Sequence, residues 1–411
     1  MSAKAKKLIY LLTALIILAL AATDIYVSSL PEMTRYFHSS PSMINLTLGI
    51  FMVGLAIGTL FAGIISDRFG RRNTLLFSTG AFVIFTLLIG CTNSIIVVIA
   101  LRLLQGLCAA FFLIIARQII KDYFPVEEQI SATATMSTGI VLSPALAPVV
   151  GAYLSSYFDW RACFFACAAV GIVVFAWLWY SLPETNNHQT ESLPTTKAFF
   201  SSYMSLLISK RFTGYMLSNG CAYGAYYAFI AISSYIYILH YGLSQQTYSY
   251  IYIALAIAYL IGNSVTKIFV KAHVRAKKAV LYGCYISVLA GLVNFIYFIK
   301  PDSSFLAVSA FTLAAVLARG GIAIVGAPMQ VLVMNDYSKK AGQAIGLLYF
   351  FTFVFEFVAT IAVSEFHRNP MLGLSLISAI FCFMMLPIWL TTMKARRKPH
   401  DFLPEFLKQL E

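Results

Sequence analysis

The sequence predicts an all-helical integral membrane protein with twelve transmembrane helices in two related halves of six. Composition, run length and charge distribution support this prediction. Of the 411 residues, 60% are hydrophobic and only 11% are charged, whereas a soluble domain carries about 25% charged residues. The apolar runs are about 20 residues long and apolar on all sides, which indicates helices across a bilayer rather than the alternating pattern of a membrane β-strand.

Twelve apolar runs are expected to span the membrane. The first follows a lysine cluster and is not followed by a small-residue cleavage site, so we interpret it as a retained span rather than a signal peptide. The runs are 8–30, 43–65, 73–92, 94–117, 129–155, 161–182, 212–237, 247–268, 279–299, 304–332, 342–364 and 371–393.

Positive charge is divided unevenly between the two sides. Of the 29 basic residues, 23 lie in the two ends of the chain and in the loops on the same side, and only four lie in the opposite loops. Basic loops remain in the cytoplasm, so this bias predicts a multi-pass protein of the cell inner membrane with both termini cytoplasmic. The basic loops also account for the net charge of +13, so this charge does not require a nucleic-acid partner. We expect the protein to be surrounded by membrane lipid.

A weak internal repeat relates the two halves. Four identities recur at a constant shift, at equivalent points of the two six-span halves, and transporters built from such repeats bind substrate between the halves near mid-membrane. We therefore expect a six-helix bundle over 1–182, a cytoplasmic linker over 183–211, a second bundle over 212–393 and a cytoplasmic tail over 394–411. The repeat places Gly106, Asp122, Tyr123 and Gln129 on Gly320, Asp336, Tyr337 and Gln343.

A charged corner, "GIISDRFGRRN" (63–73), interrupts the apolar sequence after the second span. Its glycines allow a close helix approach and a tight turn, and its Asp can form charge-assisted bonds with neighbouring Arg side chains. A turn that only sets the topology would need the basic residues but neither the Asp nor the glycine spacing. The residues concerned are Gly63, Asp67, Arg68, Gly70, Arg71 and Arg72.

The spacing of this corner resembles the loop signature of the major facilitator superfamily, in which the loop acts as a conformational latch between the halves. Two further stretches resemble the Bcr/CflA group of drug/proton antiporters: "ATDIYVSSLPEM" in the first span, and "LRLLQG", which matches the Arg-x-x-Gln-Gly pattern of antiporters at Arg102, Gln105 and Gly106. The C-terminal half lacks comparable motifs.

The fifth span, "GIVLSPALAPVVG", resembles the antiporter motif of the same family. It departs from the general pattern at Ser143, where Gly is usual, and at Ala147-Pro148, where a Gly pair is usual. A Pro-Ala-Pro variant occurs in the Bcr/CflA group. The matching positions are Gly139, Pro144, Pro148 and Gly151.

The resemblance implies a proton-coupled secondary transporter that exports drugs or drug-like small organic molecules by antiport, working as a monomer. One alternative is a transporter of a specific metabolite, such as an amino-acid derivative or a siderophore, by import or export. Another is a membrane receptor that does not transport. The sequence contains no nucleophile–base pair and no cluster of metal ligands that would indicate an enzyme. It also contains no nucleotide-binding loop, so no cofactor is expected.

Four ionisable residues lie inside spans: Asp24, Arg102, Arg319 and Glu356. Each costs at least about 2.5 kcal/mol in lipid if charged, so each is expected to face the protein interior. At 1.5 Å per residue, Asp24 and Arg102 lie within about 6 Å of each other in depth. We therefore expect them to form a proton-coupling pair, with a permanent structural ion pair as the alternative.

Glu356 and Arg319 leave three interpretations open: a structural pair, a substrate or second proton site, or an error in the span boundaries. Tyrosines from 235 to 252 are expected to form an interfacial belt, and the seven Cys to be buried apolar residues rather than disulfides or metal ligands. The proton-coupling set is Asp24, Arg102 and Glu356, and the expected substrate cavity is Tyr26, Gln105, Tyr223, Tyr226, Tyr227 and Arg319.

Overall fold

The computed structural model describes residues 3–186, 196–295 and 304–394, and all regular structure within these ranges is helical. Twelve of its helical stretches are long and apolar enough to cross a membrane, which confirms the predicted number of spans. The end of the predicted ninth span, from 296 to 299, lies outside the described residues.

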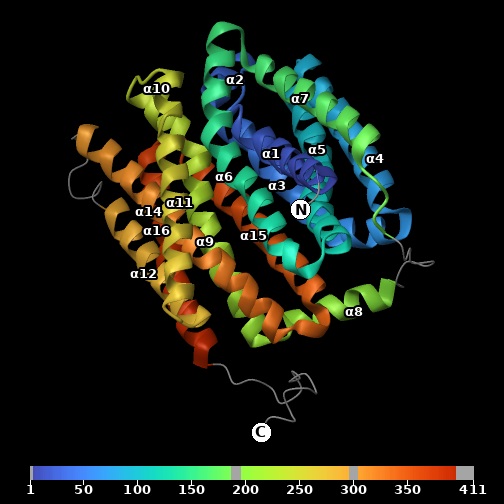
Figure 1. Cartoon of the computed structure of the whole chain (residues 1–411). Helices are drawn as coiled ribbons and strands as arrows, with labels where there is room; N and C mark the ends of the chain where they lie inside the picture. The colour runs from blue at the N-terminus through green and yellow to red at the C-terminus, as the bar shows by residue number, and fades with distance from the viewer. Residues whose placement is uncertain (1–2, 187–195, 296–303, 395–411) are drawn as a thin grey trace.

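The two halves lie side by side, in blue to green and in yellow to red (Figure 1). The N-terminal half comprises α1 (Ala3–Asp24), η1 (Val27–Ser29), α2 (Leu30–Tyr36), α3 (Pro41–Phe69), α4 (Arg71–Cys91), α5 (Ile95–Tyr123), α6 (Val126–Tyr157) and α7 (Trp160–Ser181). After α8 (Thr196–Leu207), the C-terminal half comprises α9 (Lys210–Ser234), η2 (Tyr235–His240), α10 (Gln245–Ser249), α11 (Ile251–Lys271), α12 (Ala276–Asn294), α14 (Ser304–Asp336), η3 (Ser338–Lys340), α15 (Ala341–Ser364) and α16 (Pro370–Lys394).

We call the membrane face at which α1 begins and α16 ends the terminal face, and the other the opposite face. The halves pack mainly through α3 against α15 and α6 against α11. At the opposite face, side-chain hydrogen bonds join the halves in five pairs: Thr34–Tyr235, Asn45–Ser364, Tyr153–Tyr250, Ser155–Gln245 and Ser156–Gln246. The opposite face is thus held closed.

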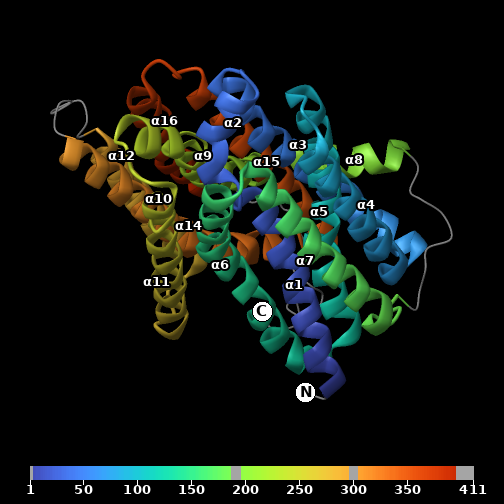
Figure 2. The same ribbon diagram turned by 90° about the horizontal axis from the view of Figure 1, so that it is seen from above.

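The terminal face is joined more loosely. Figure 2 shows α6 and α11 together near α10 and diverging toward their other ends. The linker helix α8 bridges the halves here, because the Tyr203 hydroxyl donates to the carbonyl oxygen of Leu60 in α3 at 3.4 Å, and Ser202 bonds to Gln343 in α15. Burial raises the pKa of the Tyr203 phenol, so this donor keeps its proton.

The surface of the spans is apolar. Phe77, Val173 and Ile261 are 81%, 66% and 60% exposed, which a membrane accommodates and water would not. The predicted tyrosine belt is largely wrong, because the side chains nearest the opposite face pack inside the C-terminal half. Those buried tyrosines are Tyr235, Tyr237, Tyr248 and Tyr252. All seven Cys are free thiols, and Cys91 is exposed rather than buried as expected.

The repeated glycines, Gly106 and Gly320, both lie in close helix contacts, although a Cβ on Gly320 itself would lie 3.5 Å from the nearest atom. A Cβ on Gly106 of α5 would overlap the backbone of Phe51 in α3, and a Cβ on Gly262 of α11 would overlap the carbonyl oxygen of Gly320 in α14. The second and fourth spans of each half therefore touch backbone to backbone, as small residues allow in membranes. The repeat seen in the sequence corresponds to a repeated helix contact.

Replacing Gly106 with Ala is expected to destabilise the protein, because the methyl group forces α3 and α5 apart, and overpacking costs about 1–3 kcal/mol. The measurement is the apparent melting temperature of the purified protein in detergent. Gly342→Ala serves as the control, since a Cβ there meets nothing within 4 Å. Equal melting temperatures for Gly106→Ala and the parent protein would contradict the assigned contact.

Candidate functional site

The first membrane span, Lys4–Tyr36, is broken after Asp24, about two thirds of the way along it. The last helical hydrogen bond of α1 runs from the backbone N–H of Ile25 to the carbonyl oxygen of Ala21 at 2.9 Å, after which the chain turns into η1. Gly151 of α6 approaches so closely that a Cβ on it would overlap the carbonyl oxygen of Ile25. The continuous helix expected over 8–30 thus ends at Asp24. A break inside a membrane requires other groups to bond to the freed backbone.

Arg102 of α5 supplies that bond. Its Nη1 donates to the carbonyl oxygen of Ala22 at 2.9 Å and to Oε1 of Gln105 at 2.7 Å, and its Nε donates to the carbonyl oxygen of Thr47 at 3.2 Å. Gln105 in turn donates to Thr86 in α4 at 2.7 Å. One completely buried guanidinium therefore joins α1, α3 and α5 at the depth of the break.

Aromatic rings enclose the same guanidinium. Its Cζ lies 4.1 Å from the centroid of the Phe51 ring and 4.9 Å from that of Tyr26. The Tyr26 hydroxyl is hydrogen-bonded to that of Thr47 at 3.0 Å. Tyr26 and Gln105, which the sequence suggested for the substrate cavity, are both completely buried in this network. In this conformation they hold the N-terminal half together.

The expected contact between Asp24 and Arg102 is not made. Arg102 lies within electrostatic reach of Asp24, but within the described ranges no ion pair or hydrogen bond joins them, because the guanidinium donates to the carbonyls of Ala22 and Thr47 instead. Neither a permanent ion pair nor a direct proton-coupling pair is present here. A role of Arg102 in proton coupling remains a prediction.

The cation that interacts most with Asp24 comes from the C-terminal half. Arg319 of α14 is the positive charge that interacts most strongly with Asp24, and it is also the strongest charged neighbour of Glu356 in α15. Asp24 and Glu356 also interact with each other across the interface between the halves. Their exposed fractions are only 8% for Asp24, 7% for Arg319 and 2% for Glu356. Two acids from different halves therefore face one Arg.

The helix bounds place this group near mid-membrane. Arg319 lies eleven residues after its span begins at Val308, and Glu356 lies eight residues before its span ends at Ser364. At 1.5 Å per residue these positions are about 16 Å and 12 Å from the opposite face. The depth of Arg319, which the apolar run left undetermined, now agrees with that of Glu356.

The three charged groups make no direct ion pair. Among the residues that the structure describes, no salt bridge joins Arg319 to Asp24 or to Glu356, and Nε of Arg319 and Oε2 of Glu356 are enclosed atoms without a hydrogen-bond partner. The structural Arg319–Glu356 pair, one of the three interpretations from the sequence, is therefore not formed in this conformation. Unpaired ionisable groups are costly in a membrane and are typically functional.

Tyrosines surround Arg319. Its Cζ lies 4.6 Å from the ring centroid of Tyr226 and 4.7 Å from that of Tyr259. Tyr227 packs edge-on against Tyr226, and Tyr227 and Tyr223 are half-buried beside them. Tyr223, Tyr226 and Tyr227 thus gather at the charged group, and their role in lining a substrate cavity stays a prediction. Tyr259 was missed, although its place near the middle of the eighth span distinguishes it from the tyrosines at that span's start.

The charged corner forms a network inside the N-terminal half. Nη1 of Arg71 lies 2.5 Å from Oδ1 of Asp67, and its Nε lies 3.0 Å from Oδ2 of Asp122 at the end of α5. Ser66 accepts a further bond from Arg71 at 2.6 Å and donates to Gln118 at 3.0 Å. The expected latch between halves is, in this conformation, a clamp joining α3, α4 and α5.

Backbone geometry and a linker carboxylate complete the corner. Gly70 has φ 87° and ψ 152°, a conformation that strains any residue with a side chain. The Glu184 carboxylate accepts the backbone N–H groups of Arg71 and Arg72 at 2.9 and 3.1 Å, and so caps α4. Glu184 was missed because it lies in the polar stretch assigned to the linker. Gly63 faces Gln118, and Arg68 is exposed over the Phe69 ring.

The antiporter motif fits α6 against α1. Besides Gly151, Gly139 contacts the first helix, where a Cβ would lie 3.1 Å from the carbonyl oxygen of Thr13. Ser143, the departure from the family pattern, donates to the carbonyl oxygen of Ile17 at 3.2 Å. Pro144 and Pro148 lie inside the helix, which continues through them. The residues of the motif thus determine how closely α6 packs against α1.

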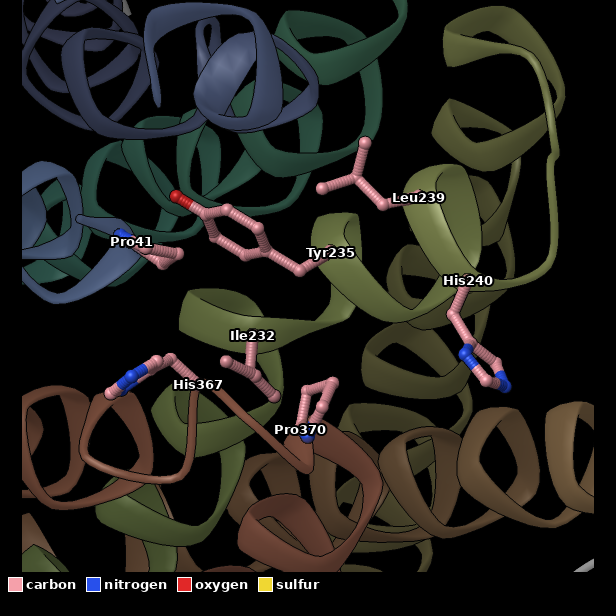
Figure 3. Close-up of a pocket in the computed structure, with 7 residues that line it drawn as sticks. All are labelled: Pro41, Ile232, Tyr235, Leu239, His240, His367 and Pro370. Carbon is pink, nitrogen blue, oxygen red and sulfur yellow. The ribbon is translucent and has the colours of Figure 1, made fainter. Parts of the chain in front are cut away.

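A small pocket opens between the halves at the opposite face (Figure 3). In it the Tyr235 ring extends toward Pro41, and two histidines stand at the rim. Its volume of about 230 Å³ is below the roughly 300–1,000 Å³ of typical small-molecule sites, so we do not assign the substrate to it. It is lined by Pro41, Ile232, Tyr235, Leu239, His240, His367 and Pro370.

The twelve-helix fold, with a charged group between its halves, defines a secondary transporter. Residues 12–360 match the profile of the Major Facilitator Superfamily, and the chain belongs to this family. Its members are transporters, so transport rather than catalysis is the class of function. The resemblance to the Bcr/CflA group is confirmed by similarity to resistance transporters.

Two relatives and one solved structure illustrate the similarity. The chain is 27% identical over 246 residues to the "Bicyclomycin resistance protein homolog" of Haemophilus influenzae, a match that covers 60% of each chain. It is 29% identical over 250 residues to "Multidrug resistance protein D" of Escherichia coli, which covers 60% of this chain and 61% of that one. The crystal structure of a D-xylose–proton symporter shares the fold with a TM-score of 0.76 at 14% identity, covering 97% and 99% of the chains.

Replacing Asp67 with Asn is expected to slow transport while leaving insertion and abundance normal. The substitution keeps the shape of the side chain and removes its charge, and the buried Arg71 retains Asp122 as a partner. The measurements are the initial rate of transport of a confirmed substrate and the amount of folded protein in the membrane.

Asp159→Asn is the matched control, because Asp159 pairs with Arg161 at the opposite face, at 3.6 Å, outside the corner. A well-expressed Asp67→Asn variant with the transport rate of the parent protein would refute the role of the corner. Equal slowing in both variants would show that the effect is not specific to it.

Proposed function

We propose that the protein is a proton-coupled antiporter that exports drugs or drug-like small organic molecules. The observation that carries the proposal is the buried group of Asp24, Glu356 and Arg319, in which two acids from different halves face one cation without an ion pair. Because the halves move relative to each other in alternating access, the distances within this group must change during transport.

Proton coupling follows from the physics of buried carboxyl groups. Low dielectric favours the neutral form, while a nearby guanidinium favours the carboxylate. A rearrangement that changes the distance of Asp24 from Arg319, or its contact with water, therefore changes its affinity for a proton. Asp24 also lies directly at the break in the first span, so we assign it the role of proton carrier and Glu356 a second coupling role.

The direction and cargo are inferred from three features. The opposite face is closed by side-chain hydrogen bonds, and the terminal face carries the predominance of basic residues. We therefore propose that both termini are cytoplasmic, that the membrane is the cell inner membrane, and that the chain works as a monomer with the domain bounds predicted from its sequence. The names of the resistance relatives and the antiporter motif in α6 support export of organic molecules.

Transport of one specific metabolite on the same scaffold is the second candidate. The charged group favours it in one respect, because two carboxylates and a guanidinium select charged cargo more strictly than an apolar cavity does. Both candidates share the coupling mechanism and differ only in cargo.

Replacing Asp24 with Asn is expected to abolish uphill, proton-driven accumulation of substrate, because the amide has nearly the same volume but cannot carry the proton. Substrate binding is expected to persist at least in part, and downhill exchange with it, since neither must move a proton. The measurement uses proteoliposomes with an imposed pH gradient and a confirmed substrate. If Asp24→Asn accumulates substrate against its gradient as the parent does, Asp24 is not the carrier, and Glu356→Gln in the same assay tests the remaining acid.

A further inference from the structure

Arg319 is a buried cation that forms no hydrogen bond or ion pair with the described residues. Only 7% of its surface is exposed, its guanidinium lies against two tyrosine rings, and its Nε is enclosed without an acceptor. Arg102 differs in degree, because its Nη1 and Nε donate to two backbone carbonyls and an amide oxygen, and only its Nη2 is enclosed without a partner. Arg102 is thus held by three hydrogen bonds within the protein, whereas Arg319 has none among the described residues.

The form of the Arg319 site matches a planar anion. Rings that lie against a guanidinium stabilise its charge by cation–π interaction but accept none of its in-plane hydrogen bonds. A guanidinium presents its N–H groups as a fork that fits the two oxygens of a carboxylate. Tyr226 and Tyr259 therefore hold the cation in place and leave its hydrogen-bonding edge for an acceptor.

The same site offers acceptors for a cation. Asp24 and Glu356 lie within electrostatic reach of Arg319 but not in an ion pair with it. Asp24 keeps 8% of its surface exposed and makes no side-chain hydrogen bond among the described residues, so its oxygens are open to a donor. An ammonium group in contact with these carboxylates would have the strong, charge-assisted bonds that a desolvated site requires.

We propose that the substrates of this transporter are zwitterionic organic molecules, whose carboxylate bonds to Arg319 and whose ammonium group lies against Asp24 and Glu356. This inference rests on the proposed transport function and narrows its cargo. A substrate with only a positive charge would leave the N–H groups of Arg319 without a hydrogen-bond acceptor. A substrate with only a negative charge would add a third negative charge beside the two acids. A zwitterion bonds both to Arg319 and to the two carboxylates, and it leaves the net charge of the site unchanged.

The half-buried tyrosines indicate which uncharged part the substrate carries. The Tyr259 ring lies against Arg319, and Tyr223 and Tyr227 are electrostatic neighbours of Arg319 and Glu356. Aromatic surface binds flat apolar groups well. The preferred cargo is therefore an aromatic or otherwise apolar body that carries both an amine and a carboxylate.

The test uses three fluorescent probes that share one dansyl body and linker. Nε-dansyl-lysine is the zwitterion, dansylcadaverine is the same molecule without the carboxylate, and N-dansyl-6-aminohexanoate is the same molecule without the amine. Binding to the full-length protein in lipid nanodiscs is followed by fluorescence anisotropy, with no pH gradient. The zwitterion is expected to bind about tenfold or more tightly than dansylcadaverine, the effect of a hydrogen bond to a charged group, and more tightly than the hexanoate.

Arg319→Gln is expected to remove the preference for the carboxylate, and Arg319→Lys to keep part of it as a point charge without the fork. Arg275→Gln, an exposed Arg at the start of α12, is the matched control and should retain the preference. Melting temperatures and gel filtration show whether each variant is folded. If Arg319→Gln does not fold, the comparison of the three probes on the parent protein still decides.

The proposal is overturned if Nε-dansyl-lysine shows no saturable binding, if dansylcadaverine binds as tightly, or if a folded Arg319→Gln variant keeps the carboxylate preference. Because binding is measured at equilibrium without a gradient, the outcome is independent of the Asp24→Asn transport experiment. Loss of the zwitterion preference with intact proton-driven export would refute the cargo alone. The reverse result would refute the coupling alone.

Discussion

The hydrogen bond from Arg102 to the carbonyl oxygen of Ala22 is the interaction on which the site depends. A membrane span that stops at Asp24 leaves backbone groups that lipid cannot satisfy, and this guanidinium satisfies one of them while bonding to α3 and to Gln105. The close approach of Gly151 holds the same turn from the other side. Without these contacts the chain would not present Asp24 at the end of a helix in the protein interior.

The use of Arg102 as a backbone partner changes the electrostatics of the site. Its donors are directed to carbonyls, so Asp24 faces Arg319 in the other half as its strongest positive neighbour. Since Glu356 faces the same Arg, the balance of charge at mid-membrane depends on how the halves are placed relative to each other. A transporter of this kind needs such a dependence, because a proton or a charged substrate bound on one side must be released on the other.

Much of this arrangement can be predicted from the sequence. The remainder cannot, and the reasons are physical. Apolar length and loop charge predict the twelve spans, and the glycine spacing predicts the turn at Gly70. Depth along a helix predicts that Asp24 and Arg102 are close, but it does not say whether the guanidinium meets a carboxylate or a carbonyl. The helix break decides that, and "ATDIYVSSLPEM" contains no proline at Ile25 to indicate it. The tyrosines of α11 show the same limit: Tyr252 and Tyr259 are seven residues apart and so share one face of the helix, and the packing of α11 against α14, not the sequence pattern, brings Tyr259 to the charged group while Tyr252 lies in the core.

The two halves also differ in how they use equivalent residues. Asp122 and Asp336 occupy repeated positions, yet Asp122 pairs with Arg71 of α4, and Asp336 pairs with Arg211 at the start of α9. In the N-terminal half, the buried charges Arg71 and Arg102 have protein partners in the same half. In the C-terminal half, the side chains of Arg319 and Glu356 form no hydrogen bond or ion pair with the described residues, and the guanidinium of Arg319 lies against two tyrosine rings. The first half therefore holds Asp24 through a bonded network, and the second half supplies the cation and the tyrosines. If the charged group binds the cargo as we propose, selection among substrates depends chiefly on the half whose sequence departs most from the family motifs.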